Sequence, residues 1–220
     1  MKQNITLLIA FVGLTLTGCN NKPITEEQGF EYGKVNNGRY TNTFFDIQIN
    51  VPKTWFVQSQ EQSQEIMDEG QKIVAGDNEN MKRALKASEI NSAGLLTVFK
   101  YEQGAAVAFN PSIMLVAENL KNAPGIKSGN EYLFHSRKLM VAGQIKYTRL
   151  DEKFEKRVIN GWEFYVMNAA ADYNGTTVSQ TYIATVKDKF ALAFIYSYAD
   201  DEQKAELEKL INTIDFYKKK

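Results

Sequence analysis

Apolar and polar residues alternate along several segments of the chain, a pattern typical of β-strands with one buried face. The segment 45–51 is the clearest example, because apolar residues occupy every second position and Pro52 ends it. Residues 55–57 are expected to form a return strand beside it. Residues 112–117 are apolar on both faces, which predicts a central strand covered on both sides. Strands are expected at 45–51, 55–57, 95–100, 112–117, 153–159, 162–170, 178–186, 190–198 and 213–217.

Helical spacing of apolar residues predicts three helical regions between these strands. Residues 60–88 favour a helix, and the polar stretch 76–80 divides it into one bent helix or two. A second region starts near Ser128. Asp200 is expected to cap a final helix. In the last third of the chain, Asn-Gly pairs at 160–161 and 174–175 and the triplet Lys187-Asp188-Lys189 predict a meander of hairpins.

The helix that starts near Ser128 has two apolar stripes. Its core face is expected to carry Tyr132, Leu133, Leu139 and Met140 with Ser136 and Gly143. Phe134 and Val141, seven residues apart, lie on the opposite side. This second stripe is either covered by another segment, which the pattern favours, or exposed as a partner surface.

The amino terminus has the organisation of an export signal, in which Lys2 precedes a 12-residue apolar run, 5–16. That run is too short to span a bilayer, which takes about 20 apolar residues. The sequence Leu16-Thr17-Gly18-Cys19 that follows resembles the lipobox of bacterial lipoproteins. The resemblance implies that diacylglycerol is attached to the sulfur of Cys19 and that a signal peptidase cuts between Gly18 and Cys19.

Three parts of the chain follow from this interpretation: a signal peptide at 1–18, a lipidated flexible tether at 19–37 and a folded domain at 38–220. Alternatively, Phe30 and Tyr32 of the tether dock onto the domain. Two or three acyl chains anchor a protein stably, whereas one binds marginally. The resemblance places the protein on the outer membrane of a diderm bacterium, or on the outer face of the cytoplasmic membrane of a monoderm.

Composition limits the chemistry further. Cys19 is the only cysteine, so the folded part has no thiol for a disulfide or for catalysis. Without Lys2, 25 basic residues remain against the 26 acidic residues, too balanced for a nucleic-acid partner. His135 is the only histidine, which argues against a zinc site. The stretch Asp77-Asn78-Glu79-Asn80 offers oxygen ligands but lacks the glycine turn and the terminal bidentate glutamate of a calcium loop. No metal site and no cofactor are therefore expected.

The order of the expected elements resembles the PsbP-like fold. The resemblance is carried by an aromatic hairpin at 40–55 with Pro52, strands at 95–100 and 110–120, a helix, the meander and a closing helix–strand pair. It implies an α+β fold with an antiparallel sheet flanked by helices on both sides. Together with the lipobox, it is most similar to bacterial lipoproteins of the DcrB type. This family has no shared catalytic residues, and a fold alone does not give a function.

Two functions of different classes are consistent with the sequence. The favoured one is a non-catalytic, membrane-tethered binding or scaffolding module, which contacts an envelope protein or a small ligand through the sheet face or a helix surface. The alternative is an envelope hydrolase that uses dispersed carboxylates such as Glu118, Glu131 or Asp172. The sequence favours the non-enzymatic hypothesis, because it contains neither a phosphate-binding glycine loop nor a Gly-x-Ser-x-Gly elbow.

Overall fold

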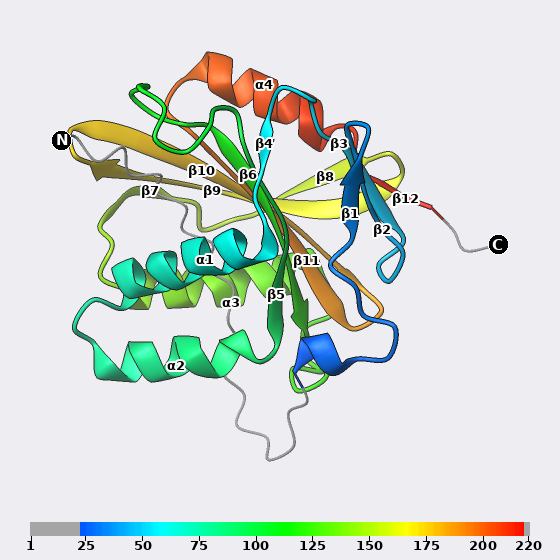
Figure 1. The fold of residues 1–220 in the computed structure, drawn as a ribbon. Coiled ribbons are helices and arrows are strands. Elements are labelled where there is room, and N and C mark those ends of the chain that lie inside the picture. The colour runs from blue at the N-terminus through cyan, green and yellow to red at the C-terminus, as the bar shows by residue number, and fades with distance from the viewer. Residues whose placement is uncertain (1–22, 218–220) are drawn as a thin grey trace.

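The computed structural model describes residues 23–217, which form two antiparallel sheets and four α-helices (Figure 1). The smaller sheet has the strand order β1-β2-β3-β12. The larger has the order β4-β5-β6-β11-β10-β9-β7, with β8 also paired to β9. The strands are β1 (Lys34–Asn36), β2 (Arg39–Asn42), β3 (Ile47–Asn50), β4 (Phe56–Val57), β5 (Ser92–Phe99), β6 (Ser112–Asn119), β7 (Tyr147–Leu150), β8 (Glu155–Ile159), β9 (Trp162–Tyr173), β10 (Thr176–Lys187), β11 (Phe190–Tyr198) and β12 (Asp215–Phe216).

The helices begin where the sequence offers capping side chains. They are α1 (Gln60–Ala75), α2 (Glu79–Glu89), α3 (Gly129–Ala142) and α4 (Asp201–Ile211). The region 60–88 therefore forms two helices, and Asn78, at the polar break, caps α2 by accepting the N–H of Met81 at 3.1 Å. Asp200 caps α4 as expected.

The larger sheet separates two hydrophobic cores, so the fold has three layers. Along β11, Phe190, Leu192, Phe194, Tyr196 and Tyr198 face one core, while Ala191, Ala193 and Ile195 face the other. Helices α1, α2 and α3 cover the second side. The first side is covered by α4 and the smaller sheet. The expected α+β class, with helices on both sides of an antiparallel sheet, is confirmed.

Two expectations about the first third of the chain are wrong. Strand β4 does not return beside β3, because it pairs with β5 at the edge of the larger sheet, through Phe56 and Phe99. Residues 23–37, expected within the flexible tether, lie on the domain. They include a short helical turn, η1 (Ile24–Glu26), and β1, which pairs with β2. Phe30 docks as in the alternative interpretation, with its ring 5.6 Å from that of Phe44.

None of the helices in residues 23–217 is long and apolar enough to cross a membrane. The described part of the chain therefore contains no membrane-spanning helix.

Candidate ligand-binding groove

Helix α3 is the element on which the candidate site is built. Its start is fixed by a capping box, in which the Ser128 hydroxyl accepts the N–H of Glu131 at 3.3 Å. The Glu131 carboxylate in turn accepts the N–H groups of Ser128 at 3.0 Å and Lys127 at 2.7 Å. The buried side of α3 carries Tyr132, Leu133, Ser136 and Met140, as the sequence predicted. These contacts hold the opposite side of the helix in a defined orientation.

That opposite side is exposed. Phe134 retains 49% and Val141 60% of their accessible surface, so the expectation that another segment covers them is wrong. The alternative, an exposed surface, describes both residues. The Nζ of Lys138 lies 4.4 Å from the centre of the Phe134 ring, within the range of a cation–π contact.

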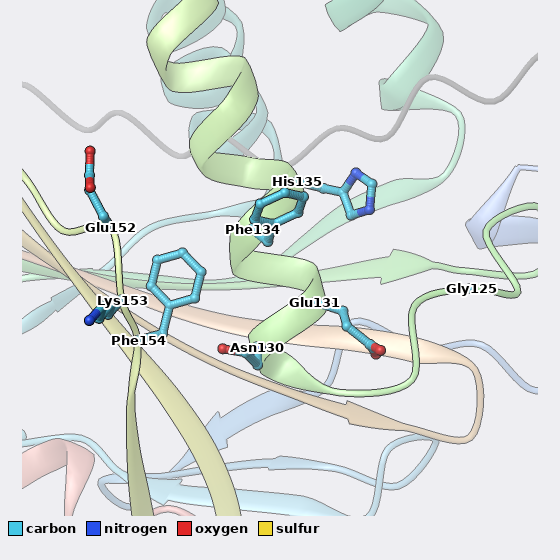
Figure 2. Close-up of a pocket in the computed structure, with 8 residues that line it drawn as sticks. All are labelled: Gly125, Asn130, Glu131, Phe134, His135, Glu152, Lys153 and Phe154. Atoms are coloured by element: carbon cyan, nitrogen blue, oxygen red, sulfur yellow. The ribbon is translucent and has the colours of Figure 1, made fainter.

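Phe134 lines an open groove of about 530 Å³ between α3 and the connection from β7 to β8. Figure 2 shows Phe134 and Phe154 on the two sides of this groove, one from the helix and the other from the connection. Polar side chains surround the two rings. The lining residues are Gly125, Asn130, Glu131, Phe134, His135, Glu152, Lys153 and Phe154.

Arg137 of α3 holds the connection from β7 to β8, which forms the other wall of the groove, against the helix. Its Nε donates a hydrogen bond to the carbonyl oxygen of Asp151 at 3.0 Å, and its guanidinium lies 3.1 Å from the carboxylate of Glu152. The Asp151 carboxylate accepts both the backbone N–H and the side-chain amide of Asn168 on β9, at 2.9 and 2.7 Å. The groove therefore has two anchored walls.

Two titratable groups in the groove, Glu131 and His135, have lowered pKa values. The backbone N–H of Lys127 is the largest cause that lowers the pKa of Glu131, and together with the Ser128 hydrogen bonds and the charge of Lys127 it outweighs desolvation. Burial, with the charge of Lys138, lowers the pKa of His135 below its ordinary value of 6.5. At pH 7 the groove thus presents an ionised carboxylate, engaged in capping, and a neutral imidazole.

The two residues of the predicted partner surface, Phe134 and Val141, do not lie in the same site. Phe134, His135 and Glu131 line one groove, whereas Val141 does not. Seven residues along a helix correspond to about 10 Å, so Val141 lies two turns beyond Phe134. Gly18 and Cys19, the predicted processing and lipidation residues, lie outside the described residues.

The three carboxylates of the hydrolase hypothesis lie in different places. Glu118 is buried in β6 and accepts a hydrogen bond from the Tyr132 hydroxyl at 3.1 Å. Glu131 caps α3. Asp172 accepts a hydrogen bond from the Thr177 hydroxyl at 2.6 Å and lines a second, smaller hollow of about 250 Å³ beside Ile73. Each therefore has a structural contact of its own.

Within residues 23–217, no group of three or more His, Cys, Asp or Glu side chains is placed to hold a metal ion. The groove holds one imidazole and two carboxylates, and one of these carboxylates caps a helix while the other pairs with Arg137.

Sequence reasoning missed Phe154, Glu152 and Lys153. Helical periodicity predicted that Phe134 lies on the side of its helix opposite the core. No comparable signal marks Phe154, because it lies in a connection and its position depends on the pairing of β7 and β8 with β9.

These features define an α+β domain with a groove that is open to solvent. No family model matches the chain, and no curated protein matches it. Similar solved structures include a cyanobacterial PsbP from Synechocystis, with 12% identity and a TM-score of 0.49, which covers 86% of this chain and 99% of its own.

Two further similar structures come from other bacteria. A protein from Bacteroides thetaiotaomicron has 11% identity and a TM-score of 0.44 over 84% of this chain, which spans half of that protein's length. LpqN of Mycobacterium tuberculosis, described as involved in cell envelope biogenesis, has 14% identity and a TM-score of 0.40 over 77% of this chain and 79% of its own. At these scores no ligand, partner or activity is transferred to this chain.

Proposed function

We propose that this chain is a lipid-anchored, extracytoplasmic binding module of the PsbP-like type, without catalytic activity, that binds a segment of an envelope protein in the groove of α3. The anchor is the lipidated Cys19 implied by the lipobox resemblance. The binding surface is the pair of rings, Phe134 and Phe154, with their polar surroundings.

The single observation that carries this proposal is the exposure of Phe134 on a wall of the groove. An exposed aromatic ring in a hollow with polar edges resembles the centre of a protein interface. The middle of the larger sheet is not available as an alternative surface, because β6 and β11 are buried along their whole length. The groove beside α3, formed by a helix and a connection, remains accessible.

The shape of the groove favours a protein segment over a small molecule. Small-molecule sites bury most of their ligand, whereas this groove is open to solvent along α3. Its lining carries both signs of charge, from Glu152 and Lys153, and the amine of Lys138 lies over the ring of Phe134. An apolar side chain of the partner would insert between the two rings, and polar groups of its backbone would reach Asn130 and the neutral His135.

Photo-crosslinking in the native host tests the groove. Benzoylphenylalanine replaces Phe134, and in a matched control it replaces Phe56, which is exposed to a similar extent, 41%, at the edge strand β4. We expect a discrete crosslinked species from position 134 and none of that mass from position 56. The Phe154→Ala substitution should reduce the species at least fivefold while the melting temperature shows that the domain stays folded.

Equal crosslinking from both positions, or a species from position 134 that survives Phe154→Ala, would contradict the groove as the binding surface. The anchor is tested separately by intact mass. Protein from the native host should carry a diacylglyceryl group on residue 19 and lack residues 1–18. The Cys19→Ala variant should no longer be found in the membrane fraction.

A further inference from the structure

The described chain begins at a point that is firmly attached to the domain. Ile24 is 1% exposed, and its N–H donates to the carbonyl oxygen of Ile90 at 2.9 Å. The carboxylate of Glu27 accepts the side-chain amide of Asn119 at 3.0 Å and pairs with Lys121. Helical turn η1 is thus fastened to the junction of α2 with β5 and to the end of β6.

Only residues 20–22 separate Cys19 from Pro23, where the described chain starts. A chain spans at most about 3.6 Å per residue, so the Cα atoms of Cys19 and Pro23 are at most about 14 Å apart. A free tether of 18 residues would have typical end-to-end distances of about 25 Å and would permit any orientation of the domain. The short connection removes that freedom.

From this limit we infer that one end of the domain lies against the lipid surface of the bilayer. This membrane-facing end consists of η1, the α2–β5 junction at Ile90, the end of β6 at Asn119–Lys121 and the turn between β10 and β11. The inference rests on the lipidation of Cys19 that is part of the proposed function. It adds which surface of the domain meets the membrane.

Backbone contacts show that these segments share one end. The N–H of Asn119 donates to the carbonyl of Asn91 at 2.8 Å, and the N–H of Leu120 donates to the carbonyl of Lys189 at 2.8 Å. In Figure 1 the dark-blue turn η1 lies at the bottom of the molecule, close to the carboxyl end of α2. The membrane-facing end is therefore a contiguous surface.

The chemistry of this end suits a lipid surface. The aliphatic side chain of Ile90 is 43% exposed directly beside the anchored turn. Lys86 and Lys189 are exposed at the same end, and their amines can approach lipid phosphates, whereas the amine of Lys121 pairs with Glu27. Glu26 and Asp188 are exposed there too, so the orientation depends on the length of the connection and not on a strongly basic field.

The groove begins near the membrane-facing end. The first turn of α3 packs tightly on β10, since a Cβ at Gly129 would come within 2.0 Å of the carbonyl oxygen of Ala184. Ala184 lies three residues before Lys187 at the membrane-facing turn. The groove would therefore be within reach of a protein in or on the same membrane.

Site-specific fluorescence quenching tests this orientation. Lipidation consumes the only native thiol, so a cysteine introduced by Thr25→Cys in η1 or by Thr177→Cys in β10 can be labelled alone. Both positions are exposed, and Thr177 lies at the far end of β10, about 33 Å from Lys187 at 3.3 Å per residue. The labelled lipoproteins are reconstituted in phosphatidylethanolamine–phosphatidylglycerol vesicles that contain a headgroup-attached nitroxide quencher.

We expect quenching at position 25 to exceed that at position 177 at least threefold. In the matched control, an 18-residue Gly/Ser insertion between Lys22 and Pro23 should remove most of this difference. Equal quenching in lipidated, vesicle-bound protein, or a difference that the insertion leaves unchanged, would overturn the orientation alone. A mass that shows no lipid on residue 19 would overturn the proposed anchor and this inference together.

Discussion

The two cores on either side of the larger sheet are built from different side chains. All five methionines of residues 23–217 lie in the core beneath α1, α2 and α3. The core beneath α4 and the smaller sheet contains five phenylalanines and three tyrosines and, among the described residues, no methionine. Several of these rings meet edge to face, such as Phe45 and Phe190 at 5.3 Å.

This difference matches the roles of the two sides. Methionine is flexible and adapts to irregular gaps, whereas ring contacts fix the relative positions of the elements that carry them. The aromatic side joins distant parts of the chain, as where Trp162 meets Phe216 at 4.5 Å. The methionine side supports α3 and its groove, where small adjustments of the helix would help a partner to bind.

The largest expected effect is on the aromatic side. Phe194→Ala removes a fully buried ring that lies 6.3 Å from that of Phe164, and it leaves a cavity between the sheet and α4. We expect a loss of about 3–5 kcal/mol in the free energy of unfolding, measured by urea denaturation. A loss below about 1 kcal/mol would show that this side repacks easily and would remove the contrast between the cores.

The second-largest effect is expected at the edge of the aromatic side, where Glu208 forms an ion pair with Arg157. Glu208 pairs with Arg157 at 2.6 Å and accepts a hydrogen bond from Tyr196. Burial tends to raise the pKa of Glu208, but these two partners outweigh it and lower the pKa below 4.5. Glu208→Gln should cost about 1.5–3 kcal/mol at pH 7.

The sign of the pH dependence follows from that shift. The ionised Glu208 is favoured by folding, so its contribution is present above its ordinary pKa of 4.5 and disappears as the pH falls through the lowered value. Unfolding curves of the wild type and Glu208→Gln at a series of pH values should therefore converge below pH 4.5. A constant difference down to acid pH would contradict the charge pairing as its cause.

A smaller effect is expected where α3 starts on the methionine side. Ser128→Ala removes the hydroxyl that accepts the N–H of Glu131, at a cost of about 1 kcal/mol in the free energy of unfolding. Ser128→Asp keeps a capping oxygen and serves as the control. Hydrogen exchange should show faster opening of the first turn of α3 in Ser128→Ala alone, and unchanged exchange there would exclude a local role of the cap.

A small change is also expected inside the methionine core. Met114→Leu conserves volume and removes only the thioether of a side chain that is fully buried in β6, so it should cost less than about 1.5 kcal/mol. Phe194→Leu, an aliphatic replacement on the other face of the sheet, should cost more. If both cost the same in urea denaturation, the two cores do not differ in adaptability.

Local sequence signals predicted the meander well. The hairpin turn at Asn160–Gly161 has φ of 47° and 84°, and that at Asn174–Gly175 has φ of 49° and 80°, conformations that asparagine and glycine adopt with little strain. Because the turn residues determine which strands become neighbours, β8, β9 and β10 follow from the sequence with nearly correct ends. The caps of α2 and α4 are local in the same sense.

The sequence did not predict the pairings between strands that lie far apart in the chain. Strand β12 pairs with β3 through Phe216 and Ile47, and both segments are too short to reveal a partner by alternation. Strand β7 is half exposed and its register with β9 shifts, so it lacks the period of a strand. The groove depends on that same pairing, which is why Phe134 could be singled out beforehand and Phe154 could not.

The clustering of methionines has a chemical consequence. In the extracytoplasmic location proposed above, the chain would meet peroxide and other oxidants, which convert exposed thioethers to sulfoxides. Every methionine of residues 23–217 is buried beneath the three helices, so these sulfurs become reactive only when that side opens. The rate of sulfoxide formation would therefore report how often α1, α2 and α3 separate from the sheet.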